Sequence, residues 1–209
     1  MSYSINEFYL LWTMVIVPRI AAVSYQDTIP FLYGIKHEAN FRADLSLSDY
    51  STVISEFNAG QADIALVPVH VVPQLHGAHI ITEYCIGFSG NDEEDEYLPI
   101  VDPKSPILSL FEGEKAPLAS LLDSETPWAY AVWVAHKDVD LEVVEQFEYA
   151  LTYGLERMYE ALLDAGCEDL EDAYDQLSHI DYVLDQQKHE TLKKFWDSGL
   201  KVPLRANPG

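Results

Sequence analysis

The side chains best suited to chemistry lie where a buried strand passes into a helix near the start of the chain. The apolar run from Arg19 to Ser24 predicts the strand, and the segment from Thr28 to Ile35 predicts the helix. Ligands of open α/β sheets bind outside the carboxyl ends of the strands, and the free N–H groups at a helix start suit an anion. The candidates at this strand end are Ser24, Tyr25, Asp27 and Thr28.

Asp27 is the candidate catalytic residue, because a carboxylate at a strand end can act as a base or orient a hydroxyl group. Ser24, Tyr25 and Thr28 are candidates for binding the substrate. A second interpretation stays open, in which Asp27 or Thr28 does no more than cap the helix that follows.

A second candidate strand end follows the most apolar segment of the chain. The run from Asp63 to Pro68 predicts a strand that is buried on both faces, as in parallel sheets. Pro68, Val69 and His70 come at its end, and a parallel sheet would bring this end beside Asp27. We therefore take these three residues as substrate-binding candidates. The alternative is a strand exit that proline shapes and that contacts no ligand.

Neither a metal nor an organic cofactor is expected. His70, His76 and His79 are close in sequence, but their spacing matches no standard zinc pattern and Cys85 does not complete one. Cys85 with a histidine could form a thiol nucleophile, but neither residue has a local signature for it. No glycine-rich phosphate loop occurs in the sequence. Cys85 and Cys167 are too few for a disulfide scaffold and are expected to be buried thiols.

The elements that would position these side chains indicate an α/β fold. Residues 19–72 alternate strand and helix as β-α-β-α-β. The elements expected further on are a strand at Trp128–Val134, a helix from Asp140 to Gly166, a helix at Asp169–Leu177, an extended piece at Ile180–Leu184 and a helix at Gln187–Trp196. Alternation along the aromatic strand puts Trp128 and Tyr130 on one face and Trp133 on the other. Residues 91–126, which begin with an acidic run, predict a loop-rich excursion.

The charge balance excludes two classes of partner. The sequence holds 35 acidic and 12 basic residues, a formal net charge of −23. Nucleic acids and acidic membrane surfaces both attract clustered Lys and Arg, so neither is an expected partner. A chain this acidic repels itself when compact unless salt screens the charges. We therefore hypothesise a host with a salty cytoplasm.

Residues 1–18 are expected to be an extension of the fold. Their longest apolar run, from Phe8 to Pro18, is shorter than the roughly 20 residues that a membrane helix needs. Glu7 precedes this run, which therefore lacks the charged start of a secretory signal. The sequence thus predicts a cytoplasmic protein. Either the run is an extra strand or Met14 is the true start.

Six segments follow, in order, the motifs of a known enzyme family. Arg19 to Gly34 is similar to R-I-x-A-V-S-Y-L-N-T-x-P-F-x-Y-G, Asp63 to Val69 to D-x-x-L-I-P-V, and Pro127 to Val134 to P-F-V-F-A-x-W-V. The other matching segments are Ile81–Gly87, Ala150–Leu155 and Ile180–Tyr182. These motifs resemble those of the chorismate dehydratases of the futalosine route to menaquinone.

The resemblance implies a two-lobed fold like that of the type II periplasmic binding proteins, with the ligand between the lobes. It implies dehydration of chorismate to 3-[(1-carboxyvinyl)oxy]benzoate and water, without a metal or organic cofactor. The protein would position the ligand and help to move a proton and release the hydroxyl group. The resemblance also adds Gly87 to the substrate-binding positions.

Two departures from the family bear on activity. Asp27 replaces the family's Asn, which adds a negative charge beside a dianionic ligand and removes the amide donors. The family's segment with a catalytic Ser has no match after Gly90. The resemblance thus implies one complete lobe, residues 19–90 and 127–200, with a central, mostly parallel sheet flanked by helices. Residues 91–126 would be a reduced second lobe, and residues 201–209 a tail.

Three functions stay open at this point. The chain could be an active hydro-lyase of the chorismate dehydratase type. It could be a catalytically inactive ligand-binding or interaction protein descended from that enzyme, and an exposed sheet edge would then favour a homodimer. It could also be the product of an internally deleted gene. In the first case, and for a ligand-binding descendant, the expected partner is a small carboxylate compound like chorismate.

Overall fold

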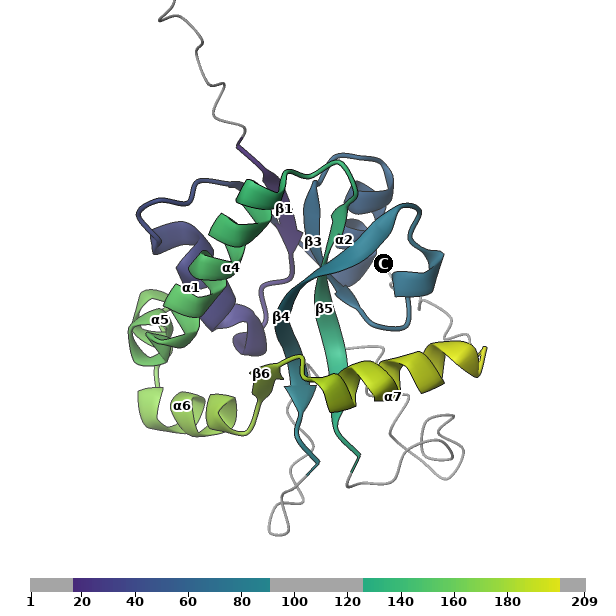
Figure 1. The fold of residues 1–209 in the computed structure, drawn as a ribbon. Coiled ribbons are helices and arrows are strands. Elements are labelled where there is room, and N and C mark those ends of the chain that lie inside the picture. The colour runs from purple at the N-terminus through teal and green to yellow at the C-terminus, as the bar shows by residue number, and fades with distance from the viewer. Residues whose placement is uncertain (1–16, 91–125, 200–209) are drawn as a thin grey trace, which may run out of the picture.

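Six strands form one sheet with helices on both faces in the computed structural model, which describes residues 17–90 and 126–199 (Figure 1). The strands are β1 (Arg19–Ala22), β2 (Asp44–Leu47), β3 (Ile64–Pro68), β4 (Ala78–Phe88), β5 (Trp128–His136) and β6 (Asp181–Val183). Their order across the sheet is β2-β1-β3-β5-β4-β6. The α/β fold class expected from the sequence is confirmed. The predicted excursion and the two terminal segments, residues 1–16 and 200–209, lie outside the described residues.

The sheet is mixed rather than mostly parallel in its pairing. β1 pairs in parallel with β2 and β3, whereas β3–β5, β5–β4 and β4–β6 are antiparallel. β1, β2 and β3 therefore run in one direction, as expected, and β4 runs in the same direction but is separated from β3 by β5. The cause is topological. Phe88 at the end of β4 pairs with Trp128 at the start of β5. The chain thus re-enters the sheet next to the point where it left, and β5 must run antiparallel to β4.

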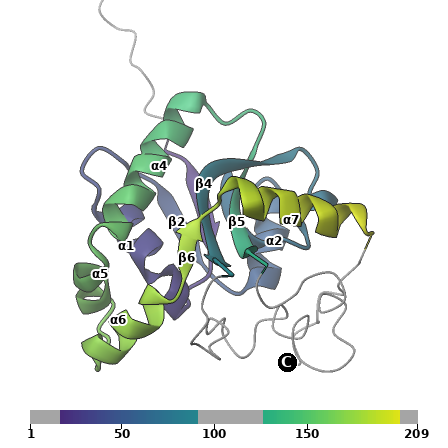
Figure 2. The same ribbon diagram turned by 60° about the horizontal axis from the view of Figure 1, so that its bottom comes forward.

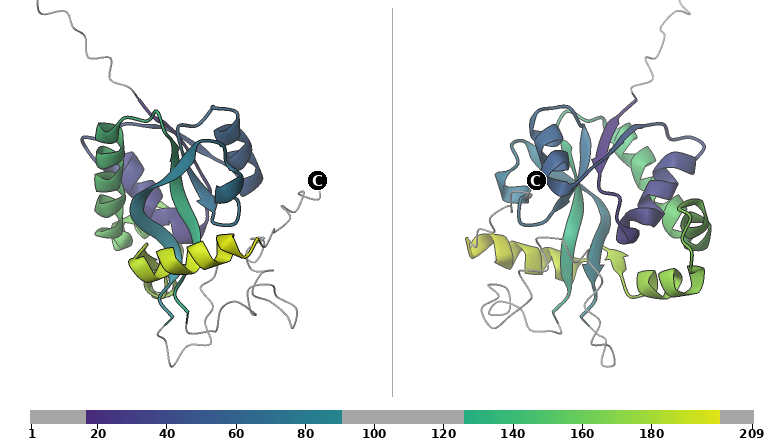
Figure 3. Two further views of the ribbon diagram at one scale, coloured as in Figure 1. Left: turned by 45° about the vertical axis from the view of Figure 1, so that its right-hand side comes forward. Right: turned by 180° about the vertical axis from the view of Figure 1, so that it is seen from behind.

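Two layers of helices cover the two faces of the sheet, as Figure 3 shows from both sides. The helices are α1 (Ile29–His37), α2 (Tyr50–Asn58), α4 (Leu141–Leu155), α5 (Met158–Asp164), α6 (Leu170–Ser178) and α7 (Gln186–Asp197). Trp133 packs edge-on against Phe31 of α1 and Phe147 of α4, whereas Trp128 packs against Phe195 of α7. The predicted alternation of the aromatic strand is confirmed. Among the described residues no helix is long and apolar enough to cross a membrane.

Four of the described helices begin after an aspartate cap. Asp49, Asp140, Asp169 and Asp185 each accept a hydrogen bond from a backbone N–H in the first turn of the helix they precede. Such caps satisfy the free donors of a helix start and typically contribute about 1 kcal/mol each. These four aspartates explain why the helix starts could be predicted from local sequence.

The prediction of one long helix from Asp140 to Gly166 is wrong in one respect. The segment forms two helices, α4 and α5, with a break at Arg157. The Arg157 guanidinium donates to the carbonyl oxygen of Tyr153 at 3.1 Å, which satisfies an acceptor at the end of α4. The break turns α5 so that Leu162 packs in a small buried cluster with Ala173 and Leu177 of α6. A tertiary contact thus overrides the helical pattern.

A close crossing of α1 and α4 holds the start of α1 in place. A Cβ atom at Gly34 would lie 1.9 Å from the carbonyl oxygen of Ala150, and one at Gly154 would lie 1.9 Å from the carbonyl oxygen of Pro30. Only glycine lets the two backbones approach this closely. Since α1 begins directly after Asp27, this crossing fixes the position of the first candidate strand end.

Candidate functional site

The two predicted strand ends lie at the same edge of the sheet. β1 and β3 pair in parallel with Ile20 opposite Ile64 and Ala21 opposite Ala65. The chain leaves β1 at Ala22 and β3 at Pro68, so both exits are on the side where β6 and α7 cross, which Figure 2 brings forward. The geometric basis of the sequence prediction, two neighbouring strand ends, is therefore present.

The turn after β1 is built around Thr28. Its hydroxyl lies 2.9 Å from the carbonyl oxygen of Val23 and 2.7 Å from that of Tyr25, and it accepts from the Tyr25 N–H at 3.1 Å. Thr28 is fully buried. These contacts engage the hydroxyl with the residues before it, and the Thr28 side chain makes no capping hydrogen bond to α1, in contrast to the capping interpretation. Thr28 therefore shapes the site, whereas Ser24 in the same turn is exposed.

Asp27 is almost fully buried, with 3% of its surface exposed. Its backbone carbonyl oxygen accepts a hydrogen bond of 3.0 Å from the hydroxyl of Tyr182 on β6. Burial raises the pKa of Tyr182 well above its usual value, and the charge of Asp27 acts in the same direction, so this hydroxyl stays protonated as a donor. This hydrogen bond connects the turn after β1 to β6.

A small hollow lies beside Asp27, with a volume of about 20 Å³. Its wall includes Gln26, Gln176 and Leu177, and the two glutamine side chains are joined by a hydrogen bond of 2.7 Å. A hollow of this size holds about one water molecule. A larger ligand at Asp27 must therefore lie over the strand ends rather than inside this hollow.

The exit of β3 is held by backbone contacts. The N–H of Val69 donates to the carbonyl oxygen of Tyr130 at 2.9 Å, and the carbonyl oxygen of Val69 accepts from the indole N–H of Trp196 at 2.8 Å. Pro68, Val69 and His70 are all buried. Burial lowers the pKa of His70 to about 4, so its imidazole is neutral at pH 7. Pro68 and Val69 thus define the backbone from which His70 projects.

Gly87 allows the neighbouring strands to approach closely rather than supplying a functional group. A Cβ atom there would lie 2.6 Å from the carbonyl oxygen of Trp128 and 3.2 Å from that of Asp181. The residue lies in β4, whose register shifts between Ile86 and Gly87. β4 itself was not predicted as a strand, although Ile80 to Ile86 is rich in the β-branched and aromatic residues that strands favour.

No metal site is found among the described residues, where no group of three or more His, Cys, Asp or Glu side chains could hold an ion. His76 and His79 are exposed and Cys85 is buried. Burial raises the pKa of the Cys85 thiol far above its usual value, which leaves it a poor nucleophile. Cys167 is only partly buried, in contrast to the expectation of two buried thiols.

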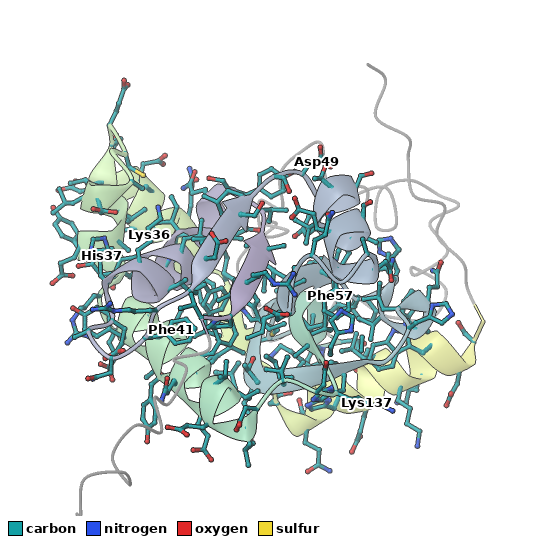
Figure 4. All side chains as sticks on the ribbon, turned by 90° about the horizontal axis from the view of Figure 1, so that it is seen from above. Lys36, His37, Phe41, Asp49, Phe57 and Lys137 are labelled. Carbon is teal, nitrogen blue, oxygen red and sulfur yellow. The ribbon has the colours of Figure 1, made fainter. Side chains whose placement is uncertain are left out.

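Several cations lie at the opposite edge of the sheet. Arg19 begins β1, Lys36 lies near the end of α1 and Lys137 follows β5, as Figure 4 shows for the labelled residues Lys36 and Lys137. Near the candidate site, Lys188 of α7 is fully buried, but its ammonium group is paired with Asp181 and lies 3.7 Å from Asp185. The ion pair of Lys188 with Asp181 therefore connects α7 to β6. The polar groups closest to the strand ends in sequence are uncharged apart from Asp27.

Sequence reasoning missed two residues that position the strand ends. Trp196 and Gln176 come from the last helices, 127 residues from Val69 and 150 residues from Gln26, respectively. Tyr182 belongs to a segment noted for its resemblance, but no local signal links it to Asp27, 155 residues away. The only signal available was the aromatic character of Trp196 on the inward face of the predicted last helix.

No known family model matches the sequence, and neither does any curated protein. Solved structures do match. Protein AF1704 from Archaeoglobus fulgidus has a TM-score of 0.62 at 14% identity over 86% of this chain and 95% of that chain. The CA3427 gene product of Candida albicans, described as having the generic periplasmic binding protein fold, has a TM-score of 0.53 at 11% identity over 92% and 99%.

A third similar structure is the alkanesulfonate-binding protein SsuA from Xanthomonas axonopodis pv. citri bound to MOPS, with a TM-score of 0.53 at 10% identity over 90% of this chain and 95% of that chain. Identities this low show the fold alone. Together with the β2-β1-β3-β5-β4 order of the sheet, they show that the chain has a periplasmic-binding-protein-like fold of type II.

Proposed function

We propose that this chain binds a small carboxylate compound over the ends of β1 and β3 and acts as a chorismate dehydratase-like protein of menaquinone biosynthesis. The observation that carries the proposal is the placement of buried Asp27 and buried His70 on neighbouring strand ends of a binding-protein-like lobe. In such α/β sheets the carboxyl ends of the strands are where ligands bind. The motif resemblance supplies the identity of the ligand.

The reaction removes a ring proton and a hydroxyl group from chorismate and releases water, which leaves an aromatic ring. Asp27 is placed to accept the proton or to orient the departing hydroxyl group, since it is the one carboxylate in the turn after β1. Positioning and exclusion of bulk water are the protein's main contributions, as expected for a reaction driven by aromatisation. Tyr182 and Thr28 hold the turn in which Asp27 lies.

Product formation from chorismate tests the proposal. The purified chain is incubated with chorismate, and the aromatic product and the loss of substrate are followed by chromatography and absorbance. Asp27→Ala should reduce the rate at least about 100-fold, which corresponds to the usual contribution of a positioned acid or base. Asp138→Asn is the matched control, because Asp138 is an exposed aspartate in the turn after β5 at the opposite edge.

The alternative is an inactive ligand-binding descendant of the same enzyme. It is favoured by the change from Asn to Asp at position 27, which places a negative charge where a dianion would bind. Calorimetric titration with chorismate separates the two functions: binding without product supports the descendant, and product supports the enzyme. Neither binding nor product at high protein concentration would remove both. We retain a cytoplasmic location within this proposal, in keeping with the free thiols of Cys85 and Cys167.

A further inference from the structure

His70 has an unusual combination of burial and unused hydrogen-bonding capacity. Only 4% of its surface is exposed, yet within residues 17–90 and 126–199 neither ring nitrogen has a hydrogen-bond partner. A buried polar group left without a partner costs about 1–3 kcal/mol. Native structures rarely keep such a group unless it has a role in binding or catalysis, or a partner not yet seen.

The backbone around His70 is, in contrast, held by several hydrogen bonds. Its own carbonyl oxygen accepts from the side-chain amide of Gln74 at 3.2 Å, and the preceding residue, Val69, is hydrogen-bonded to Tyr130 and Trp196. The N–H of Val71 donates to the carbonyl oxygen of Pro68 at 3.1 Å. A rigid backbone that presents an unused imidazole is the arrangement expected of a pre-organised binding group.

We propose that His70 contacts the bound ligand through a ring nitrogen and that Trp196 is the positioning residue that holds it there. The inference rests on the proposed function, because it assigns a contact within the same strand-end site. Trp196 acts through the hydrogen bond from its indole N–H to the carbonyl oxygen of Val69, next to His70. In this assignment α7 supports a site that lies at the ends of β1 and β3.

The chemistry of the imidazole limits what it can recognise. The neutral ring offers one N–H donor and one acceptor nitrogen. It can therefore donate to a carboxylate or ether oxygen, or accept from a hydroxyl group, but it adds no positive charge. This suits a ligand such as chorismate, which carries a hydroxyl group and an ether oxygen in addition to its two carboxylates. His70 would then select for the uncharged polar groups of the ligand.

Histidine NMR on the full chain tests the assignment. The chain is labelled with ¹⁵N-histidine, and His70→Phe identifies the His70 signals among the seven histidines. Saturating chorismate should shift the His70 ring signals and leave those of His136 unchanged. His136 is a suitable reference, because it ends β5 at the opposite edge of the sheet, where its Nε2 lies 3.0 Å from the carbonyl oxygen of Phe57.

Two variants separate contact from positioning. His70→Phe should weaken chorismate binding about tenfold or more, the effect of losing one buried hydrogen bond of about 1.4 kcal/mol. Trp196→Phe removes the indole N–H but keeps an aromatic ring, so it should shift the His70 signals even without ligand and weaken binding several-fold. Trp133→Phe is the control: this tryptophan is buried, and its N–H has no partner among the described residues. It should leave the His70 signals and the affinity unchanged.

The outcomes distinguish this inference from the proposed function. If chorismate binds but the His70 signals do not move, or if His70→Phe binds as tightly as the parent chain, the inference is overturned and the proposed function stands. If chorismate is neither bound nor converted but 3-hydroxybenzoate shifts the His70 signals, the inference holds and the dehydratase function falls. If neither compound shifts them, His70 is not a ligand contact. Unchanged free-state signals in Trp196→Phe would remove its positioning role.

Discussion

Replacing Gly34 by alanine tests the helix crossing that positions the Asp27 turn. A Cβ atom at Gly34 would lie 1.9 Å from the carbonyl oxygen of Ala150 on α4. The closest ordinary contacts between carbon and oxygen are about 3.3 Å, so α1 and α4 must separate by roughly 1.4 Å. Overpacking of this kind typically costs about 1–3 kcal/mol. Backbone atoms form the contact, so no side chain can move aside to reduce that cost.

A competing effect has the opposite sign. Alanine inside a helix is favoured over glycine by about 1 kcal/mol, since glycine loses more conformational freedom on folding. The clash should outweigh this gain, and we expect Gly34→Ala to lower the free energy of unfolding by about 1–2 kcal/mol. In a chain of this size that corresponds to a fall in Tm of about 2–8 °C. If the crossing were looser than described, the same substitution would stabilise the protein.

Thermal and urea unfolding followed by circular dichroism measure this difference at fixed salt. Gly60→Ala is the matched control, because Gly60 has a positive φ of 67° and nothing within 4 Å of an added Cβ atom. Its cost is confined to backbone strain of about 1 kcal/mol, and it should not change chorismate affinity. Gly34→Ala should weaken that affinity, since α1 begins next to Asp27. An unchanged or higher Tm for Gly34→Ala would refute the reasoning.

Four further predictions follow from the described contacts. Burial of Asp63 raises its pKa, but the bidentate hydrogen bonds from Arg19 outweigh this and lower the pKa overall. The stability from this pair should therefore be present above about pH 4 and be lost as the pH falls further. Arg19→Ala, measured by urea unfolding at pH 7 and pH 3, should cost up to about 1 kcal/mol at pH 7 and less at pH 3. Asp181→Asn leaves buried Lys188 without its closest anion and should lower the free energy of unfolding by about 3 kcal/mol. The double variant Asp181→Asn/Lys188→Met should recover most of that loss in urea unfolding. No recovery would contradict a buried ion pair. With a net charge of −23, molar potassium chloride should raise the Tm above its low-salt value, and equal Tm values would count against the hypothesis of a salty host. Replacement of residues 91–125 by a short hairpin linker should leave the rest of the chain folded, because Phe88 and Trp128 already pair. A circular dichroism spectrum typical of an unfolded chain would show that the fold depends on that segment.

The elements that sequence predicts well are those with local causes. β2 (Asp44–Leu47) lies within the β-α-β-α-β segment that the sequence predicts, and a local hydrogen bond from Asp49 caps the helix that follows. β4 was missed because its register shifts between Ile80 and Cys85 disrupt simple alternation. The break at Arg157 was missed because its cause is the packing of α5 on α6, which no window of sequence along one helix contains.

Local sequence likewise accounts for one part of the candidate site and not for the other. Parallel pairing of β1 with β3 follows from the alternation of strands and helices, and it brings the strand ends that precede Asp27 and His70 to the same edge of the sheet. The residues that hold these two in place come from the far end of the chain. Tyr182 and Trp196 bond backbone carbonyl groups, which accept from any donor and therefore leave no complementary pattern in the sequence.

The place at which residues 91–125 interrupt the lobe has a physical consequence for the proposed function. Phe88 and Trp128 are paired neighbours in the sheet, so the chain leaves and re-enters the lobe at adjacent points. An insertion between adjacent points can change in length with a small entropic cost, about 0.6 kcal/mol for each doubling, and without altering any strand pairing. The interruption also lies at the carboxyl edge of β3, where the site is proposed. Changes in the length of this segment can therefore leave the strand ends before Asp27 and His70 in place, so an intact fold does not establish activity, and binding and catalysis must be measured separately in this chain.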